Sequence, residues 1–317
     1  MAYFDLPLAA LQTYNPAEKS PADFDSFWKK TLAASAAFPL DPQYVPLDDP
    51  IYALVSAYDL TFTGYMGQRV KGWFIVPAGA KGKLPCVVSY IGYTGGRSLP
   101  VDHFAPVVAG FAHLVMDTRA QGGDTGDEGP CGPSIGGYMT RGILNRDDYF
   151  YRRLFTDAAR AVDVARAHPL VDPARVCVTG GSQGGGIAIA AAGLAGTKVK
   201  LAMPDVPFLC HYTRATTLVD SMPYGEIAYY IKAHRADEAQ VFKTLAYFDG
   251  IHFASRIKAR CLFSVGLMDT ICPPSTVYAA YNRIKGKKDI RVYTFNTHEG
   301  GGVVQTQERM RYAAKYL

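Results

Sequence analysis

One serine stands inside a glycine cluster, in the stretch "RVCVTGGSQGGGIAIAAAGLAG" from Arg175 to Gly196. A β-branched apolar run precedes Ser182 and an alanine-rich run follows it, which predicts a strand, a sharp turn and a helix. The residues from Gly180 to Gly184 match the G-x-S-x-G nucleophile elbow, whose small neighbours let the strand and the helix close around a strained serine. Ser182 is therefore a candidate nucleophile for acyl transfer.

A glycine loop that binds phosphate is the main alternative for this stretch, and a purely structural turn is a second. A P-loop needs Lys-Ser or Lys-Thr after its last glycine, and a dinucleotide fingerprint needs G-x-G-x-x-G with an acidic residue about 20 residues further on. The chain has no lysine after these glycines until Lys198. We therefore favour the nucleophile elbow.

A serine nucleophile also needs a histidine base and an acid that orients it. Asp269 follows the strand-like run "CLFSVG", and His298 follows "IRVYTF", so the chain order is serine, acid, histidine, as an elbow of this kind requires. Because the carboxyl ends of parallel strands share one edge of a sheet, we expect the three side chains to meet there. Asp205, at the end of "LAMPD", is an alternative acid; we favour Asp269.

The remaining histidines give weaker signals. We expect packing or surface roles for four of them, His103, His113, His168 and His234, whereas His211 and His252 are candidates to line a cleft. The spacing of histidine and cysteine matches no zinc site, so we expect no metal.

Stabilising the oxyanion of an acyl-transfer intermediate takes two backbone N–H groups. One is expected from Gln183, at the positive end of the helix after the nucleophile. The other is expected from Tyr93 in "VVSYIGYTGGRSLP", where glycines let the backbone approach a substrate and the tyrosine ring would form a pocket wall. An ordinary aromatic residue on a glycine turn is the alternative for Tyr93.

The elements that would position these residues alternate between apolar strands and helices, which predicts an α/β fold with a mostly parallel central sheet flanked by helices. Strands at 51–63 and 70–76 are expected to open the sheet in antiparallel fashion. An amino-terminal helix is expected to begin at Ser20-Pro21. We expect residues 1–317 to form a single domain, with residues 1–45 as a helical extension and 206–256 as a helical insertion over the carboxyl ends of the strands.

Composition excludes several classes of protein. The chain has 317 residues, of which 49% are hydrophobic, and its net charge of +5 is scattered, so neither disorder nor nucleic-acid binding is expected. It has no run of eighteen apolar residues, and its first residues do not resemble a secretory leader. The six cysteines occur singly, as is typical of a reducing compartment. We expect a cytoplasmic protein that does not bind membranes.

The chain resembles the acetyl xylan esterase and cephalosporin C deacetylase family of α/β-hydrolases over nearly its whole length. The matching stretches, as they stand here, are "FDLPLAALQTY", "YIGYTGGR", "MDTRAQGGDTGD", "GGYMTRGILNRDDYFYRRLFTDAARAVD", "GGSQGGGIAIA", "DVPFLCHYTRA", "FKTLAYFDGIHFASRIKARCLFSVGLMDTICPPSTVYAAYN" and "NTHEGGG". It departs from the family at Ala120, where glycine is usual, and in the link Asp127–Gly137, which is shorter than in some members.

The resemblance implies an α/β-hydrolase fold and a cofactor-free serine esterase that deacetylates small acetylated sugars such as xylo-oligosaccharides, and cephalosporin C. It implies Ser182 as nucleophile, Asp269 as acid, His298 as base, and Tyr93 and Gln183 as the oxyanion hole. It also implies that Pro223 and Ile271 shape the acyl pocket, and that the protein forms a homo-hexamer. A peptidase of the dipeptidyl-peptidase or acylaminoacyl type and a non-enzymatic binding module are the alternatives. The first normally carries a large amino-terminal propeller, and the second is expected to lack a triad residue.

Overall fold

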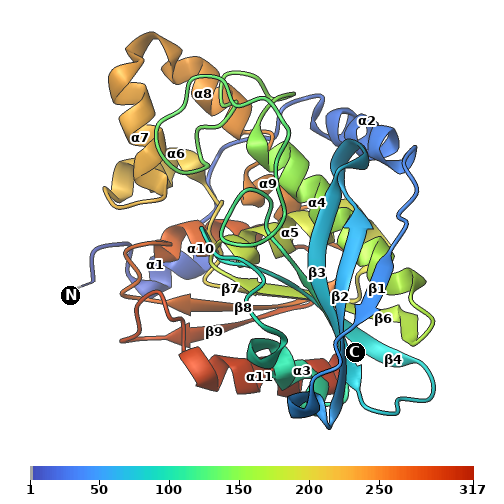
Figure 1. The fold of residues 1–317 in the computed structure, drawn as a ribbon. Coiled ribbons are helices and arrows are strands. Elements are labelled where there is room, and N and C mark those ends of the chain that lie inside the picture. Colours follow the sequence, from blue (N-terminus) through green and yellow to red (C-terminus); the bar gives the residue numbers. More distant parts are fainter. Residues whose placement is uncertain (1–2) are drawn as a thin grey trace.

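The computed structural model describes residues 3–317. Over these residues nine strands form one sheet in the order β1-β2-β3-β5-β4-β6-β7-β8-β9. Figure 1 shows this twisted sheet at the centre of the molecule. The strands are β1 (Gln43–Pro46), β2 (Val55–Thr63), β3 (Arg69–Pro77), β4 (Leu84–Tyr90), β5 (Ala112–Met116), β6 (Val171–Gly181), β7 (Leu201–Asp205), β8 (Arg260–Gly266) and β9 (Lys288–Tyr293).

The type of strand pairing changes once across the sheet, at β5. Pairing is antiparallel from β1 through β2 and β3 to β5, and parallel from β5 through β4, β6, β7 and β8 to β9. The antiparallel opening and the mostly parallel sheet are confirmed. Strand β1 was not anticipated, because it is short, contains Pro46 and is largely exposed, so its sequence has little of the apolar pattern of a buried strand.

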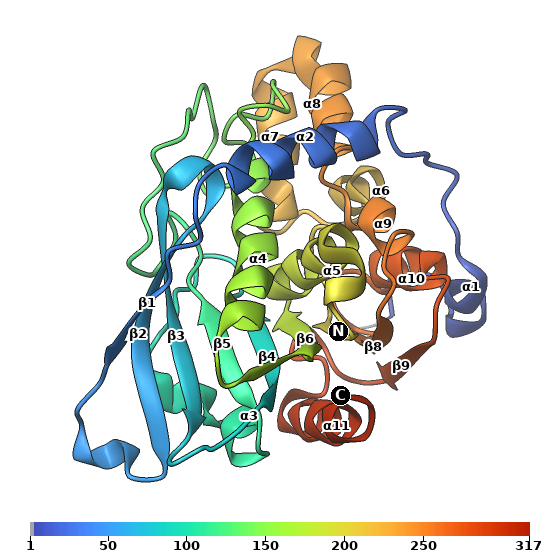
Figure 2. The same cartoon turned by 90° about the vertical axis from the view of Figure 1, so that its right-hand side faces the viewer.

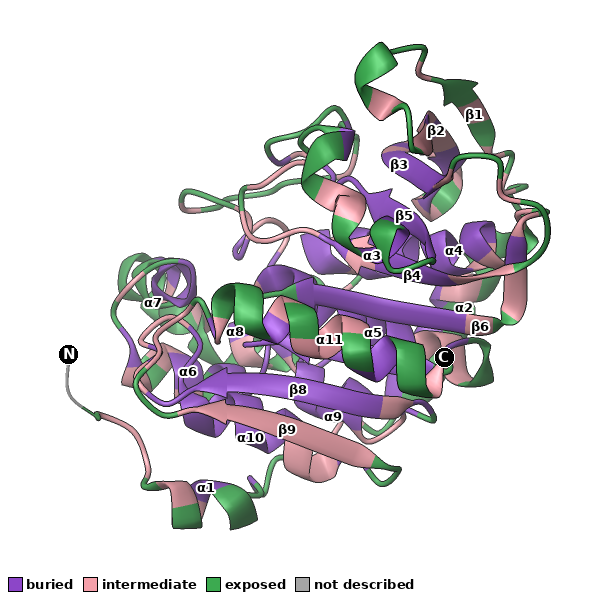
Figure 3. Cartoon of the chain, turned by 90° about the horizontal axis from the view of Figure 1, so that it is seen from below, coloured by how far each residue is buried: buried purple, intermediate pink, exposed green. Residues whose placement is uncertain are grey.

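Helices cover both faces of the sheet (Figure 2). One face carries α4 (Phe150–Ala167), α5 (Gln183–Ala195), α9 (Gly250–Ala254) and α10 (Pro274–Arg283), and the other carries α3 (Phe104–Val108) and α11 (Gly302–Tyr316). Figure 3 shows the central strands buried between these layers. Helix α5 is buried over most of its length, which its glycine and alanine content permits because small side chains let it pack closely on neighbouring elements.

The amino-terminal segment contains α1 (Leu8–Thr13) and α2 (Phe24–Ala36). The prediction that a helix begins at Ser20-Pro21 was wrong: residues 22–23 form a turn, and Asp23 is the N-cap of α2. A cap residue and a proline are compatible with a turn as well as a helix start, so they could not locate the boundary. The aromatic face is as expected, since Phe24, Phe27 and Trp28 are buried.

Residues 206–256, which we expected to form a helical insertion, are mainly helical. They contain α6 (Tyr212–Leu218), α7 (Tyr224–Ala233), α8 (Glu238–Leu245) and α9, with a short 3-10 helix η5 (Arg235–Asp237) between α7 and α8. Helices α6, α7 and α8 gather on the side of the sheet toward which β8 points (Figures 1 and 3). The other 3-10 turns are η1 (Pro50–Tyr52), η2 (Tyr65–Gly67), η3 (Pro100–His103) and η4 (Gly196–Lys198). No helix within residues 3–317 combines the length and apolar character needed to cross a bilayer.

Candidate active site

Ser182 lies at the sharp turn between β6 and α5. Its backbone has φ 55° and ψ −121°, a strained conformation for an L-residue, with a cost of order 1–3 kcal/mol. Neighbouring segments hold it in place: the Ser182 N–H donates to the Asp205 carbonyl oxygen at 3.0 Å, and the Ser182 carbonyl accepts from the Phe208 N–H at 2.9 Å. The turn that the sequence predicted is therefore present, and it is tied to the end of β7.

The glycines around Ser182 are explained by close backbone packing. A Cβ atom on Gly180 would lie 2.5 Å from the backbone of Gly184 and 2.7 Å from the Tyr90 carbonyl oxygen. A Cβ atom on Gly184 would collide with the Tyr90 backbone. Strand β6, helix α5 and the end of β4 can therefore approach one another only with glycine at these two positions.

Asp269 and His298 follow β8 and β9, and the structure brings their side chains together. The Nδ1 atom of His298 lies 2.9 Å from Oδ2 of Asp269. The Asp269 side chain is fully buried, whereas that of His298 is 32% exposed. A carboxylate accepts, so this contact assigns the proton on neutral His298 to Nδ1 and leaves Nε2 as the basic nitrogen.

The second oxygen of Asp269 is also engaged. Its Oδ1 accepts hydrogen bonds from the backbone N–H groups of Ile271 at 2.8 Å and Cys272 at 2.9 Å. These donors orient the carboxylate toward His298 and stabilise its negative charge in a buried place. The acid thus has the surroundings needed to fix the tautomer and orientation of an imidazole.

The alternative acid, Asp205, contacts helix α11 and not His298. Its Oδ1 accepts from Nε2 of Gln305 at 2.7 Å, and its Oδ2 lies 3.0 Å from Nε of Arg309. Burial raises the pKa of the Asp205 carboxyl above its ordinary value, against the lowering effect of Arg309. Between the two candidate acids, the geometry favours Asp269.

The loop that carries His298 is held by its neighbour Glu299. The Glu299 carboxylate accepts from Oγ1 of Thr297 at 2.6 Å, from the Thr297 N–H at 3.0 Å and from Nδ2 of Asn296 at 2.7 Å. These hydrogen bonds, those of the Thr297 and Asn296 side chains foremost, lower the pKa of Glu299 to about 2. Ionised Glu299 therefore stabilises the turn formed by the residues just before His298.

The two expected oxyanion donors lie at the start of α5 and on the loop after β4, and the buried side chain of Gln121 connects these two segments. As the first residue of α5, Gln183 has an N–H without an intrahelical acceptor, and within residues 3–317 the Tyr93 N–H donates to no protein acceptor. Oε1 of Gln121 accepts from the Thr94 N–H at 2.7 Å, and Nε2 of Gln121 donates to Oε1 of Gln183 at 3.0 Å. Sequence reasoning missed Gln121; its only signal was its place in the matching stretch "MDTRAQGGDTGD".

Cys272 is a buried thiol next to the candidate triad. Burial raises the pKa of this thiol well above its ordinary value and outweighs the lowering effect of a hydrogen bond with the Ser182 side chain. A thiol that stays protonated is a poor nucleophile, so Cys272 does not compete with Ser182 for that role. Among residues 3–317, ligand atoms of Asp269, Cys272 and His298 form a group close enough for a metal, within 4.8 Å of one another. A metal there would compete with the bond between His298 and Asp269.

The remaining candidates are two residues expected in the acyl pocket and two histidines expected to line a cleft. Pro223 is buried immediately before α7, and Ile271 is half-buried two residues after Asp269. His211 and His252 are buried where the insertion meets the amino-terminal segment: Nε2 of His211 lies 3.0 Å from Oε1 of Glu18, and the ring of His252 packs edge-on against Phe24. These contacts favour a packing role for both histidines.

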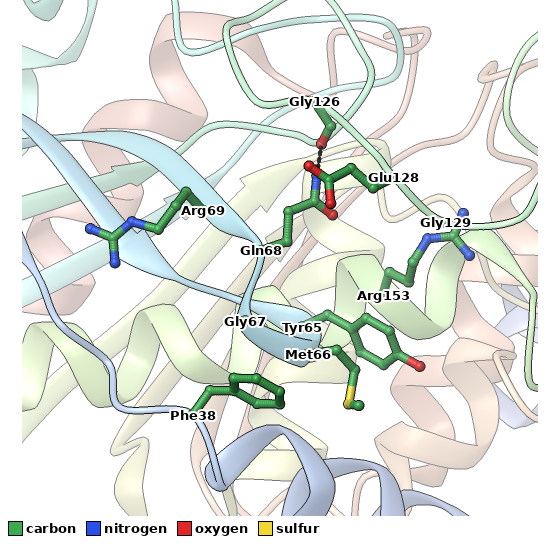
Figure 4. Close-up of a pocket in the computed structure, with 10 residues that line it drawn as sticks. All are labelled: Phe38, Tyr65, Met66, Gly67, Gln68, Arg69, Gly126, Glu128, Gly129 and Arg153. Atoms are coloured by element: carbon green, nitrogen blue, oxygen red, sulfur yellow. Dashed lines mark hydrogen bonds between the residues drawn. The ribbon is translucent and has the colours of Figure 1, made fainter.

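A pocket of about 710 Å³ lies elsewhere, and none of the residues that line it belongs to the candidate triad (Figure 4). Two of its polar side chains are already engaged: Nε2 of Gln68 donates to the Gly126 carbonyl at 2.7 Å, and Arg153 pairs with Asp127 at 2.7 Å. An open pocket without a nucleophile and a base carries no acyl transfer, so Ser182 and its neighbours remain the candidate site. The lining residues are Phe38, Tyr65, Met66, Gly67, Gln68, Arg69, Gly126, Glu128, Gly129 and Arg153.

The sheet order, the helices on both faces and the elbow after β6 are those of an α/β-hydrolase. Within that class the chain belongs to the acetyl xylan esterase family, since the model of this family, "Acetyl xylan esterase (AXE1)", matches residues 1–316. The fold and the family expected from the sequence are both confirmed.

Two solved structures are similar over almost the whole chain. The acetyl xylan esterase from Paenibacillus sp. R4 is 41% identical with a TM-score of 0.95, covering 98% of this chain and 100% of that one. Acetyl xylan esterase 1 from Thermoanaerobacterium sp. JW/SL YS485 is 36% identical with a TM-score of 0.90, covering 97% and 99%.

A curated relative, the acetyl esterase Axe7A of Xylanibacter ruminicola, is 27% identical over 290 residues, which is 89% of this chain. The match spans 64% of that relative's length. A prolyl endopeptidase with a TM-score of 0.62 is only 17% identical and shares the fold alone.

Proposed function

We propose that this protein is a serine esterase that removes acetyl groups from small acetylated sugars such as xylo-oligosaccharides. The observation that carries the proposal is the 2.9 Å contact between His298 Nδ1 and the buried Asp269 carboxylate, at the same sheet edge as the strained Ser182 turn. Membership of the acetyl xylan esterase family supports the acetyl ester as substrate.

The reaction proceeds through an acetyl-enzyme. His298 Nε2 takes the proton of the Ser182 hydroxyl as its oxygen attacks the ester carbonyl, and the N–H groups of Gln183 and Tyr93 stabilise the oxyanion. Protonated His298 then gives its proton to the departing sugar alcohol, while Asp269 stabilises the imidazolium. A water molecule, activated by His298, then attacks the acetyl-enzyme in the same way, which releases acetate and restores the Ser182 hydroxyl. No step calls for a cofactor.

The acyl side of the site is formed by Tyr93, Pro223 and Ile271. Bulky or rigid side chains at these positions would fit a methyl group and exclude longer acyl chains by steric overlap. These residues contact the acyl group and leave the alcohol part of the ester unrestricted. Cephalosporin C carries an acetyl ester on a different alcohol, so we include it among the proposed substrates.

Acyl-enzyme formation provides the test. Mixing the protein with 4-nitrophenyl acetate should release a burst of nitrophenol stoichiometric with active sites, and Ser182→Ala should abolish it. Acetate release from acetylated xylo-oligosaccharides, glucose pentaacetate and cephalosporin C would then rank the natural substrates. A burst that persists in Ser182→Ala, or no acetate release from any acetylated sugar, would contradict the proposal.

The expected homo-hexamer and the cytoplasmic location remain predictions. Exposed apolar side chains, among them Phe295 and Val303 near the start of α11, offer surface that an assembly could cover. Light scattering during size-exclusion chromatography would measure the mass directly; a monomer at micromolar concentration would contradict the hexamer.

A further inference from the structure

A buried carboxylate from the helical insertion contacts the loop that carries Tyr93. Glu226 lies in the first turn of α7 and is 4% exposed. Its Oε1 accepts from the Tyr93 hydroxyl at 2.7 Å, and its Oε2 accepts from the Met139 N–H at 3.0 Å. Within residues 3–317 no Lys, Arg or His side chain lies within ion-pair distance of Glu226. The carboxylate is therefore held by hydrogen-bond donors and not by an ion pair.

The Tyr93 hydroxyl is fixed from two sides. It donates to Glu226 and accepts from the Tyr138 N–H at 2.6 Å. Burial, with the nearby Glu226 charge next in effect, raises the pKa of Tyr93 far above its ordinary value, so the phenol keeps the proton that it donates. Burial raises the pKa of Glu226 above its ordinary value, and the hydrogen bonds from Tyr93 and the Met139 N–H act against that rise. Held by both a donor and an acceptor, the Tyr93 hydroxyl restrains the position of its ring.

Three separate segments meet at this carboxylate. Tyr93 belongs to the expected oxyanion loop, residues 138–139 follow the link Asp127–Gly137, and Glu226 is one helical turn from Pro223 on the expected acyl wall. Gly137 has φ +54°, and a Cβ atom there would collide with the Glu226 carboxyl group, so the link packs directly on it. A shift of Glu226 would therefore move the oxyanion loop and the acyl wall relative to each other.

We propose that Glu226 is a positioning residue that acts through the Tyr93 phenol to hold the oxyanion loop against the acyl wall, and so sets the preference for acetyl over longer acyl groups. The inference rests on the proposed function and adds a determinant of its specificity. Glu226 itself is not required to touch the substrate, since its oxygens are occupied by Tyr93 and Met139.

Glu226→Gln tests this directly, because it keeps the shape but removes the charge and one of the two acceptors. A misplacement of about 1 Å costs up to about 100-fold in rate, so kcat/KM for nitrophenyl acetate should fall roughly 10- to 100-fold, mainly in kcat. The ratio of butyrate to acetate kcat/KM should rise at least several-fold as the wall relaxes. Tyr93→Phe should have the same effect, and the double variant should add little to it.

The matched control is Glu238→Gln, an exposed glutamate in the first turn of α8 of the same insertion. Its rate and its ester ratio should equal those of the wild type. A purely structural role for Glu226 would lower activity equally for all esters and leave the ratio unchanged, and that result would overturn the inference. Should Glu226→Gln fail to fold, an unchanged ratio in Tyr93→Phe would overturn it in the same way. An active Ser182→Ala would instead refute the proposed function, so the two failures are distinguishable.

Discussion

His298 Nδ1 and Asp269 Oδ2 lie 2.9 Å apart although 29 positions separate the residues in the chain. Parallel pairing of β8 with β9 places the two strand ends side by side, and each side chain leaves the loop that follows its strand. The geometry leaves His298 Nε2 free for proton transfer.

Ser182→Ala should abolish esterase turnover and leave the fold intact. Alanine keeps the backbone conformation of the turn and removes only the attacking oxygen, and truncating a triad nucleophile costs about 10⁶-fold in kcat. Steady-state hydrolysis of nitrophenyl acetate and circular dichroism provide the measurement. More than about a hundredth of wild-type activity in a folded variant would place the nucleophile elsewhere.

Asp269→Asn should reduce kcat by about 10³- to 10⁵-fold, because an amide neither stabilises the imidazolium nor fixes the correct tautomer. Asp205→Asn is the matched control. It should leave kcat within about tenfold and instead lower the free energy of unfolding, by roughly 1–3 kcal/mol, because Arg309 loses its charged partner. The opposite pattern in two folded variants would reverse the assignment of the acid.

Esters of increasing chain length should be hydrolysed with steeply falling kcat/KM beyond propionate. The expected cause is steric exclusion at Tyr93, Pro223 and Ile271, whereas an open apolar pocket would gain up to about 0.8 kcal/mol per added CH₂. Nitrophenyl esters from acetate to octanoate provide the series. A rise toward butyrate or octanoate would indicate a general carboxylesterase.

Glu299 should make stability depend on pH in the acid range. Its pKa in the folded protein is about 2, below its ordinary value of 4.5, so the folded state binds this proton less tightly than the unfolded state. The stabilisation from Glu299 is therefore complete above about pH 4.5 and is lost as the pH falls toward 2. Urea unfolding of wild type and Glu299→Gln should differ most above pH 4.5. A difference that grows on acidification would refute this reading, and because Glu299 is near the surface, the effect should shrink in high salt.

Ala120→Gly should not destabilise the protein. Ala120 has φ 57°, and a left-handed conformation costs an L-residue about 1–2 kcal/mol, whereas glycine adds about 0.4–1 kcal/mol of unfolded-state entropy. The net change is a gain of between about 0 and about 1.6 kcal/mol in the free energy of unfolding. Chemical denaturation measures it, with Ala120→Val as the control that should lose stability. A loss of more than about 1 kcal/mol in Ala120→Gly would show that the alanine methyl group packs favourably.

The glycine-flanked serine, the acid and histidine after two later apolar strands, and the alternation of strand and helix were readable from the sequence alone. These features are local: a strand, its turn and the residue at its end are encoded within a dozen positions, and parallel pairing then brings strand ends to one edge. The same locality explains the incorrect start of α2, since Ser20-Pro21 suits a turn as well as a helix.

The tertiary structure decided which acid faces the histidine and what supports the site. Asp205 ends the buried strand β7 and Asp269 follows the buried strand β8. Only the placement of Gln305 and Arg309 on α11 shows that the Asp205 carboxylate is bound to other side chains. The contacts of Gln121 with Gln183 and of Glu226 with Tyr93 join residues 62 and 133 positions apart. Such contacts leave no repeating pattern in the sequence, because they depend on how the loops and the inserted helices pack against the sheet.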